Sequence, residues 1–274
     1  MKKPFFSIII PTLNEEKYLP RLISNLKNQI NKNFETIIID GKSTDATKKI
    51  IFKHKNFFNF KFIEIEPNLS NQKNLGGKIA LGKYLIFIDA DMLVSKYFTN
   101  IAEEQIKKKK GLVFLPYVIP QEKKEYPEIN IIFPIVNRLV EWSQTINKPF
   151  SSGPSMIWEK DAFNLIGGFD NLFGEDHHII RKAFYWGIKA KCLSKLKVNF
   201  SLRRMKKEGK LKLIYHFITA TTYLLFKDKL QEKTFKYKMG GQIYNTKDVK
   251  VKKEEFFKGY LKQINKLFNK LIKD

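Results

Sequence analysis

The chain has 274 residues, long enough for one large folded core or for one domain with an appendage. Its hydrophobic fraction of 43% includes many aromatic residues, which excludes general disorder and indicates a globular protein. Cys192 is the single cysteine, which excludes an internal disulfide and any multi-cysteine metal site, so we expect a buried, inert thiol in a reducing compartment.

Short apolar runs alternate with helix-like stretches along the first 115 residues. This alternation predicts an α/β fold with a mainly parallel sheet flanked by helices. The expected strands are Phe6–Ile10, Thr36–Ile39, Lys61–Ile65, Tyr84–Ile88 and Leu112–Leu115, and the expected helices are Leu19–Asn28, Ala46–Phe52, Ser70–Leu81 and Lys96–Lys109.

Two other segments are read from their composition. Met1 to Pro4 lead into the first apolar run without a secretory signal pattern, so we expect a cytoplasmic protein. The proline-containing stretch Pro116–Phe150 matches no motif, and we expect a mobile acceptor-side loop or short helices there.

Three polar clusters follow predicted strands, and the carboxyl ends of parallel strands meet at one edge of a sheet. The clusters are Pro11-Thr12, Asp40-Gly41 and Asp89-Ala90-Asp91. Asp89 and Asp91 repel each other, and burial would raise their pKa values unless a cation lies beside them. A hydrated divalent metal carrying a diphosphate would relieve this repulsion, so the edge is suited to a nucleotide-diphosphate site.

The positive charge is concentrated in the C-terminal third. Residues 1–180 contain 25 Lys and Arg against 20 Asp and Glu, a net charge of +5, whereas residues 181–274 contain 26 against 7, a net charge of +19. Such a segment favours an anionic partner, either nucleic acid or an acidic membrane leaflet, where each basic side chain near the lipid contributes about 1 kcal/mol.

Residues 254–273 predict a basic amphipathic helix. Apolar residues recur at three- and four-residue spacings, and lysines recur every four residues on another face. Its apolar face would pack on the parent domain, on a second copy in a homodimer, or on a membrane surface. The apolar stretch Leu211 to Phe226 is too short and too polar to span a bilayer, which takes about 20 predominantly apolar residues.

Five segments in order resemble the family 2 glycosyltransferases of the GT-A fold. They are Ser7–Glu16, Ile37–Thr47, Asn74–Asp91, Gly167–Asp170 and Gly174–His177. The resemblance implies an enzyme that transfers a hexose from a UDP- or GDP-sugar to an acceptor with inversion at the anomeric carbon.

The resemblance also implies roles on the donor side. Asp40 would accept from the base or ribose, with Ser43 in the same loop, and Lys73 would face a phosphate where the family usually has arginine. Asp89 and Asp91 fill the family's DxD positions and would bind Mn²⁺ or Mg²⁺. The remaining donor-side residues implied are Pro11, Thr12, Asn14, Glu15, Asn74, Ala90, Arg203 and Arg204.

Glu175 and Asp176 match the family's acidic pair, and Asp176 is the expected general base; a first-turn helix acid is the alternative. If the acceptor is an already ionised lipid phosphate, Asp176 would position it instead. Trp158 and His177 are expected on the acceptor side, although Trp158 is also suited to a core position. His177 and His178 are adjacent and cannot form a two-histidine metal face. His216 is a metal candidate by position only.

We therefore expect a GT-A domain over residues 1–205 and a basic helical extension over 206–274, acting on a lipid-linked or glycan acceptor at the anionic inner membrane face, with no nucleic acid partner. The alternatives are a basic nucleic-acid-binding protein, favoured by the net charge of +24, and an inactive GT-A scaffold. A nicotinamide dehydrogenase is excluded because Pro11 to Asn14 stand where its glycine fingerprint would follow the first strand.

Overall fold

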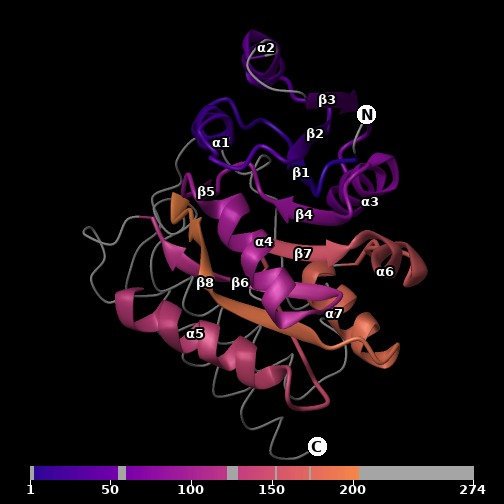
Figure 1. The fold of residues 1–274 in the computed structure, drawn as a ribbon. Helices are drawn as coiled ribbons and strands as arrows, with labels where there is room; N and C mark the ends of the chain where they lie inside the picture. The colour runs from indigo at the N-terminus through magenta and orange to yellow at the C-terminus, as the bar shows by residue number, and fades with distance from the viewer. Residues whose placement is uncertain (1–2, 55–59, 122–128, 152, 173, 204–274) are drawn as a thin grey trace, which may run out of the picture. The chain divides into compact units, whose positions relative to one another are not determined.

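The computed structural model describes residues 3–54, 60–121, 129–151, 153–172 and 174–203. Within them an eight-stranded sheet has the order β3-β2-β1-β4-β7-β6-β8-β5 (Figure 1). The strands are β1 (Phe6–Thr12), β2 (Phe34–Asp40), β3 (Phe60–Glu64), β4 (Tyr84–Ile88), β5 (Leu93–Val94), β6 (Val113–Pro120), β7 (Ser155–Glu159) and β8 (Ala190–Phe200).

The sheet is parallel in its first half and mixed in its second. The pairs β3/β2, β2/β1, β1/β4 and β6/β8 are parallel, whereas β4/β7, β7/β6 and β8/β5 are antiparallel. The register of β1 against β2 places Thr12 opposite Asp40. The predicted α/β sheet is thus confirmed, and its antiparallel pairs all lie beyond β4.

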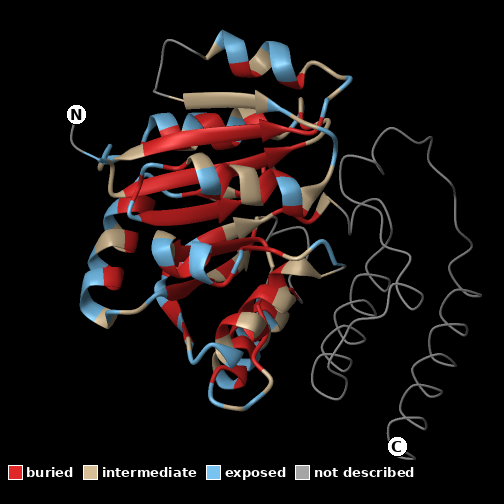
Figure 2. Ribbon diagram, turned by 90° about the vertical axis from the view of Figure 1, so that its right-hand side faces the viewer, coloured by how far each residue is buried: buried red, intermediate tan, exposed pale blue. Residues whose placement is uncertain are grey.

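Helices cover both faces of the sheet. They are α1 (Leu19–Lys27), α2 (Thr47–Lys53), α3 (Leu69–Ile79), α4 (Phe98–Lys109), α5 (Ile129–Ser143), α6 (Lys160–Leu165) and α7 (Glu175–Tyr185). Alternate residues of a strand face opposite sides, so the fully buried β1 contributes Phe6, Ile8 and Ile10 to a cluster with α1 and α4. Figure 2 shows these strands as a buried layer and the outer helix surfaces as exposed.

Two glycines allow α3 to lie close to the opposite face of the sheet. A Cβ on Gly76 would overlap with Ile9 of β1, and one on Gly77 would lie 2.6 Å from Cε1 of Phe163 in α6. The ring centroid of Phe163 lies 5.1 Å from that of Phe87 in β4. This close packing fixes α3, and with it Lys73 and Asn74, against β1 and α6.

The expectation of a loop or short helices over Pro116–Phe150 was wrong for much of that stretch. Residues 113–120 form β6, and residues 129–143 form the 15-residue helix α5 with Pro134 inside it. Pairing with β8 explains why β6 tolerates prolines that discourage a strand when the sequence is read alone.

The first compact unit of the chain ends at Ser201. The predicted extension over 206–274, with its amphipathic helix and His216, lies outside the described residues. Within the described ranges no helix is both long and apolar enough to cross a bilayer.

Candidate active site

Asp40 at the end of β2 joins two loops at the carboxyl edge of the sheet. Its Oδ1 accepts hydrogen bonds of 2.7 Å from the hydroxyls of Thr12 and Ser43, and its Oδ2 accepts one of 2.7 Å from the amide of Ser43. Asp40 has no solvent exposure. These bonds orient the carboxylate and tie the loop after β2 to the end of β1.

The loop after β1 is held against the loop after β2. Asn14 has a left-handed backbone with φ of 54°, which asparagine tolerates, and its Oδ1 accepts from the Thr44 amide at 2.8 Å. Its own amide donates to Ser43 Oγ at 2.8 Å, and the Glu15 amide donates to Thr47 Oγ1 at 2.8 Å. Pro11 and Glu15 are buried in the same region, and their place in a nucleotide pocket stays a prediction.

Asp89 and Asp91 follow the buried strand β4, and Ala90 between them is buried at 3% exposure. Burial raises the pKa of Asp89 to about 7, Lys73 opposes the rise, and Asp91, Glu175 and Asp176 add to it. A carboxylate in this setting is stabilised by an added cation. The structure therefore brings the predicted DxD acids close to the predicted acceptor-side acids.

Lys73 of α3 pairs with Glu175 at the start of α7. Its Nζ lies 2.7 Å from Glu175 Oε1 and 5.0 Å from the ring centroid of Phe169, and its side chain is 5% exposed. Burial lowers the pKa of Lys73, but Glu175, Asp89 and Asp176 outweigh it and raise the pKa. For Glu175, burial raises the pKa and the ion pair with Lys73 outweighs it, so its pKa is lowered. Lys73 thus has a carboxylate partner within the protein, and its contact with a donor phosphate stays a prediction.

Asp176 lies in the first turn of α7 beneath the loop that precedes β7. Its exposure is 8%, and a Cβ on Gly153 would lie 3.0 Å from its Oδ2. Burial raises the pKa of Asp176, His177 and Lys73 oppose the rise, and Glu175 adds to it. A carboxylate with a raised pKa, beside one held ionised by Lys73, is suited to accept a proton.

His177 connects Asp176 to the same loop. Its Nδ1 accepts from the Ser151 amide at 3.3 Å, which places the ring proton on Nε2, and Nε2 lies 3.7 Å from Asp176 Oδ2. His178 is half-buried, and burial lowers its pKa. The two histidines thus have different surroundings.

Asn74 is hydrogen-bonded to the turn that contains Phe169. Its side-chain amide donates to the Phe169 carbonyl, and its Oδ1 accepts from the Phe169 amide, both at 2.8 Å. Lys182 of α7 holds the other side of this turn through the carboxylate of Asp170 at 2.7 Å. Asn74 therefore positions the segment that carries the Phe169 ring against Lys73.

The prediction that Trp158 lies on the acceptor side was wrong. Its ring lies within β7 with no exposure, its Nε1 lies 3.1 Å from Met156 Sδ, and its ring centroid is 5.9 Å from that of Phe163. A ring in this position cannot stack on a sugar, so the alternative core position holds. Arg203 is half-buried at the end of the described residues, and Arg204 lies outside them.

Among the described residues, no three His, Cys, Asp or Glu side chains are placed so that together they could hold a metal ion. Asp89 and Asp91 would therefore need further oxygen ligands from substrate or water.

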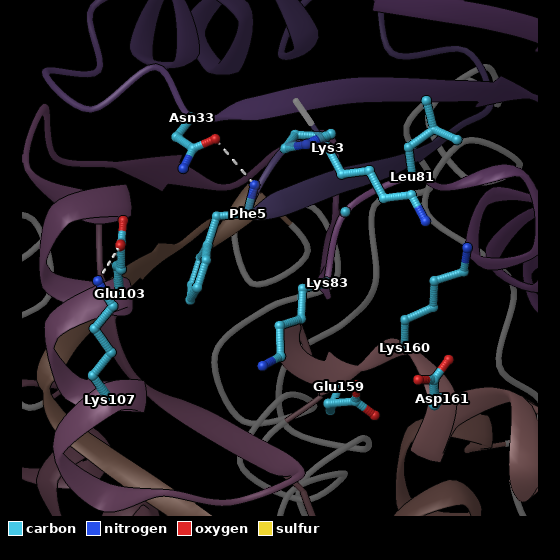
Figure 3. A pocket seen from close by; sticks show the side chains of 12 residues that line it. Lys3, Phe5, Asn33, Leu81, Lys83, Glu103, Lys107, Glu159, Lys160 and Asp161 are labelled. Carbon is cyan, nitrogen blue, oxygen red and sulfur yellow. Dashed lines mark hydrogen bonds and ion pairs between the residues drawn. The ribbon is translucent and has the colours of Figure 1, made fainter. Parts of the chain in front are cut away.

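A separate pocket of about 600 Å³ lies at the other edge of the sheet, where β1 and β4 begin and β7 ends (Figure 3). Its wall includes Phe5, Leu81 and Lys83, with Lys107 paired to Glu103 at 2.5 Å. None of the predicted site residues lines it.

Sequence reasoning missed three supporting features. Gln72 is buried and its amide donates to the carbonyls of Thr12 at 2.9 Å and Ile39 at 2.8 Å, tying α3 to the ends of β1 and β2. Phe169 covers the Lys73 ammonium, and the loop containing Ser151 and Gly153 covers Asp176. The sequence signal for Gln72 was a polar residue next to Lys73 in a predicted helix. The positions of Phe169 and of the loop with Ser151 and Gly153 depend on tertiary contacts, which the sequence does not show.

The sequence profile described as Glycosyl transferase family 2 matches residues 7–168, more than half of the chain. The chain belongs to glycosyl transferase family 2. This match covers β1 through the start of the Gly167-Gly168 turn, so it includes the ends of β1, β2 and β4 described above.

Two curated relatives are similar over part of the family region. The poly(ribitol-phosphate) beta-N-acetylglucosaminyltransferase TarS of Staphylococcus aureus is 35% identical over 96 residues, 33% of this chain and 17% of that protein. A dolichyl N-acetyl-alpha-D-glucosaminyl phosphate 3-beta-D-2,3-diacetamido-2,3-dideoxy-beta-D-glucuronosyltransferase of Methanococcus voltae is 34% identical over 173 residues. That match covers 58% of this chain and 49% of the relative, so the chain spans at most about half the length of either protein.

Solved structures share the fold. TarS of S. aureus in complex with UDP-GlcNAc matches 84% of this chain and 68% of its own with a TM-score of 0.58 and 22% identity. The mannosyltransferase PcManGT of Pyrobaculum calidifontis, in complex with GDP-Man and Mn²⁺, matches 83% of this chain and 63% of its own with a TM-score of 0.63 and 16% identity. The predicted GT-A fold is confirmed by these likenesses.

Proposed function

We propose that the protein transfers a sugar, with inversion, from a nucleotide-diphosphate sugar to a hydroxyl or phosphate of a lipid-linked or glycan acceptor. The observation that carries the proposal is the meeting of Asp89, from the end of β4, with Glu175 and Asp176, from the start of α7, around Lys73. An acidic cluster with a single buried ammonium is suited to bind a cation and to accept a proton.

The nucleotide would lie over the ends of β1 and β2. Asp40 is oriented by Thr12 and Ser43 but has no solvent exposure, so it would accept a hydrogen bond from a base or ribose only after the loops around it open. The relatives whose structures contain UDP-GlcNAc or GDP-Man share this fold, which supports a UDP- or GDP-sugar as donor.

Asp89 and Asp91 would hold Mn²⁺ or Mg²⁺. The fit is supported by the raised pKa of Asp89, because a bound cation would offset the repulsion that burial and the neighbouring acids impose on it. Carboxylate oxygens are also the ligands these ions prefer. Such an ion, when bound, stabilises negative charge on the departing diphosphate.

Asp176 would take the proton from an acceptor hydroxyl. The pKa of this carboxyl is raised by burial, and His177 lies at 3.7 Å with Nε2 directed toward it. Lys73 neutralises Glu175, so the second acid of the pair does not compete for the proton. If the acceptor is an ionised lipid phosphate, Asp176 positions it and the proton transfer is not required.

Residues 1–205 would form the catalytic domain. Residues 206–274 would bind an anionic membrane surface on the cytoplasmic side or a second subunit, as their basic amphipathic sequence favours. A lipid-linked acceptor is supported by the lipid-phosphate acceptor in the name of the M. voltae relative.

The test is donor binding by titration calorimetry with a panel of UDP- and GDP-sugars and Mn²⁺, together with donor hydrolysis. We expect one donor class to bind, and both binding and hydrolysis to be lost in EDTA and in Asp91→Ala. Asp161→Ala is the matched control, because Asp161 is an exposed acid at the other edge of the sheet.

If Asp161→Ala also lost donor binding, the loss in Asp91→Ala would reflect the change in net charge and not a role of Asp91 in the site. Binding of no donor, together with salt-sensitive binding to RNA or DNA, would replace the proposal by a nucleic-acid role. Donor binding without hydrolysis or transfer to any acceptor would indicate an inactive scaffold.

A further inference from the structure

One face of α5 presents apolar side chains to solvent. Ile131, Ile135 and Trp142 are 68%, 54% and 53% exposed, and Leu139 is 37% exposed. They recur at four- and three-residue spacings and so form one stripe along the helix, which lies at the lower end of the ribbon in Figure 1. A contiguous apolar surface of this kind marks an interaction site more often than isolated exposed residues do.

The opposite face of α5 already supplies its packing. The ring centroid of Phe133 lies 5.8 Å from that of Phe200 in β8, and the Asn137 side chain bonds both the amide and the carbonyl of Val118 in β6 at 2.9 and 2.8 Å. The helix is therefore held by its inner face, and the domain does not need the outer stripe for its own core.

The composition of the stripe and the charge of the chain favour an anionic lipid surface as its occupant. Tryptophan beside aliphatic residues is typical of helices that lie in the membrane interface. The two charged residues of α5, Arg138 and Glu141, pair with each other at 3.0 Å, so the preference for an anionic surface comes from the net charge of the whole chain. A second copy would bring together two chains of net charge +24, which repel each other. Nucleic acid is a poor occupant, because its phosphates would face a stripe that is mainly apolar.

The stripe is connected to the candidate acceptor side. Directly after α5, the Gln144 side chain donates to the Phe150 carbonyl at 2.8 Å, and the Phe150 amide donates to Ser143 Oγ at 3.2 Å. The next residue, Ser151, donates to His177, which lies beside Asp176. A surface bound by α5 would thus lie next in sequence and in space to the loop that covers Asp176.

We propose that the exposed stripe of α5 docks the catalytic domain on the surface of an anionic bilayer, with the acceptor side of the site facing the lipid. This surface belongs to the described domain and is distinct from the basic C-terminal segment. The inference that the acceptor is reached from the lipid surface rests on the proposed function, whereas the docking of α5 on the bilayer does not.

The test uses the fluorescence of Trp142 in the full chain carrying Trp186→Phe. Trp142 and Trp158 then remain, and Trp158 has no exposure and cannot meet lipid. We expect vesicles of phosphatidylcholine with phosphatidylglycerol to shift the emission to the blue, and brominated acyl chains to quench it. Pure phosphatidylcholine vesicles should produce a weaker effect.

Substitutions show whether vesicle binding depends on the α5 stripe or on exposed apolar side chains in general. Ile131→Ser with Ile135→Ser should weaken vesicle binding at least about tenfold, because two large apolar side chains no longer enter the interface. The control, Leu165→Ser with Leu172→Ser, removes side chains that are 62% and 49% exposed elsewhere on the domain, and should leave binding unchanged. Donor binding should persist in both double variants. Vesicle binding by a wild-type protein that binds no donor would contradict the proposed function alone, and donor binding without vesicle binding would contradict the docking alone.

Three outcomes would overturn the docking proposal. Vesicle binding without quenching of Trp142 would show that another segment meets the lipid. Absence of vesicle binding would remove the occupant altogether. Self-association in sedimentation experiments, abolished by the Ile131 and Ile135 substitutions and insensitive to lipid, would make the stripe a contact between two copies.

Discussion

Replacing Lys73 by methionine tests whether the buried ion pair organises the site. Lys73 Nζ and Glu175 Oε1 are 2.7 Å apart, and the two side chains are 5% and 14% exposed. Removing one partner of a buried pair costs about 3 to 5 kcal/mol, because the other charge stays buried without compensation. Lys73→Met should therefore lower the melting temperature by roughly 6 to 20 °C in a domain of this size.

The pair Lys182 and Asp170 provides a matched control. Its atoms are also 2.7 Å apart, but the side chains are 27% and 43% exposed. Solvent screens such a pair, so Lys182→Met should cost about 0 to 1 kcal/mol. Urea denaturation followed by the emission of the buried Trp158 measures both variants.

The pH dependence gives a second check with a defined sign. The raised pKa of Lys73 gives stability that is present below lysine's ordinary 10.5, and the lowered pKa of Glu175 gives stability that is present above glutamate's ordinary 4.5. The cost of Lys73→Met should be complete near pH 7. The loss of unfolding free energy in Lys73→Met should become smaller as the pH falls below 4.5, because a protonated Glu175 needs no counter-ion.

The double variant Lys73→Met with Glu175→Gln should be less destabilised than the sum of the single variants, by about 1 to 3 kcal/mol. If Lys73→Met costs no more than Lys182→Met, and the double-mutant coupling is within error of zero, the buried pair does not organise the site and the reasoning fails.

Three further changes test other parts of the site. Asp176→Asn should lower the rate of sugar transfer to a hydroxyl acceptor by about 10² to 10⁴-fold while donor affinity in calorimetry stays unchanged; a parallel loss of affinity would argue against a proton-accepting role. Gly168→Ala should cost more in urea denaturation than Gly187→Ala, because both have positive φ but a Cβ at 168 would lie 2.5 Å from Asn74 Oδ1 and one at 187 would meet nothing within 4 Å; equal costs would contradict this packing argument. In EDTA, stability should fall as the pH rises from 3.8 to about 7, because burial raises the pKa of Asp89 and the folded state retains its proton. Asp89→Asn should reduce that fall, with Asp176 contributing the rest, and a slope unchanged in Asp89→Asn would place the titration elsewhere.

The first half of the sheet was predictable because its strands are continuous apolar runs. Residues 6–10 and 84–88 are buried on both faces, so they read as strands without knowledge of their neighbours. The strand β8 alternates buried and exposed residues over Ala190–Phe200 but carries three lysines, and β7 is only five residues long. Their pairing with β6 and β4 comes from tertiary contacts that a local pattern does not contain.

The site residues divide in the same way. Thr12, Asp40 and Asp89 were predictable because each follows a strand, and the topology of a parallel sheet brings strand ends together. The partners of Lys73 and Asn74 were not, because they lie about 100 residues further along the chain in segments whose approach depends on α3 packing against the sheet. A motif places a residue at an edge of the sheet, whereas the partner it meets there depends on the packing of the elements around it.

Lys73 shows how this difference changes a role. An arginine at this position would offer a planar fork to phosphate oxygens, whereas a lysine offers one compact charge on a flexible stem. In the structure that charge is buried between Glu175 and the Phe169 ring, at a distance where it also offsets Asp89 and Asp176. An ammonium so enclosed neutralises the acids around it, so exchanging Lys73 for arginine should disturb the acidic cluster before it improved any contact with phosphate.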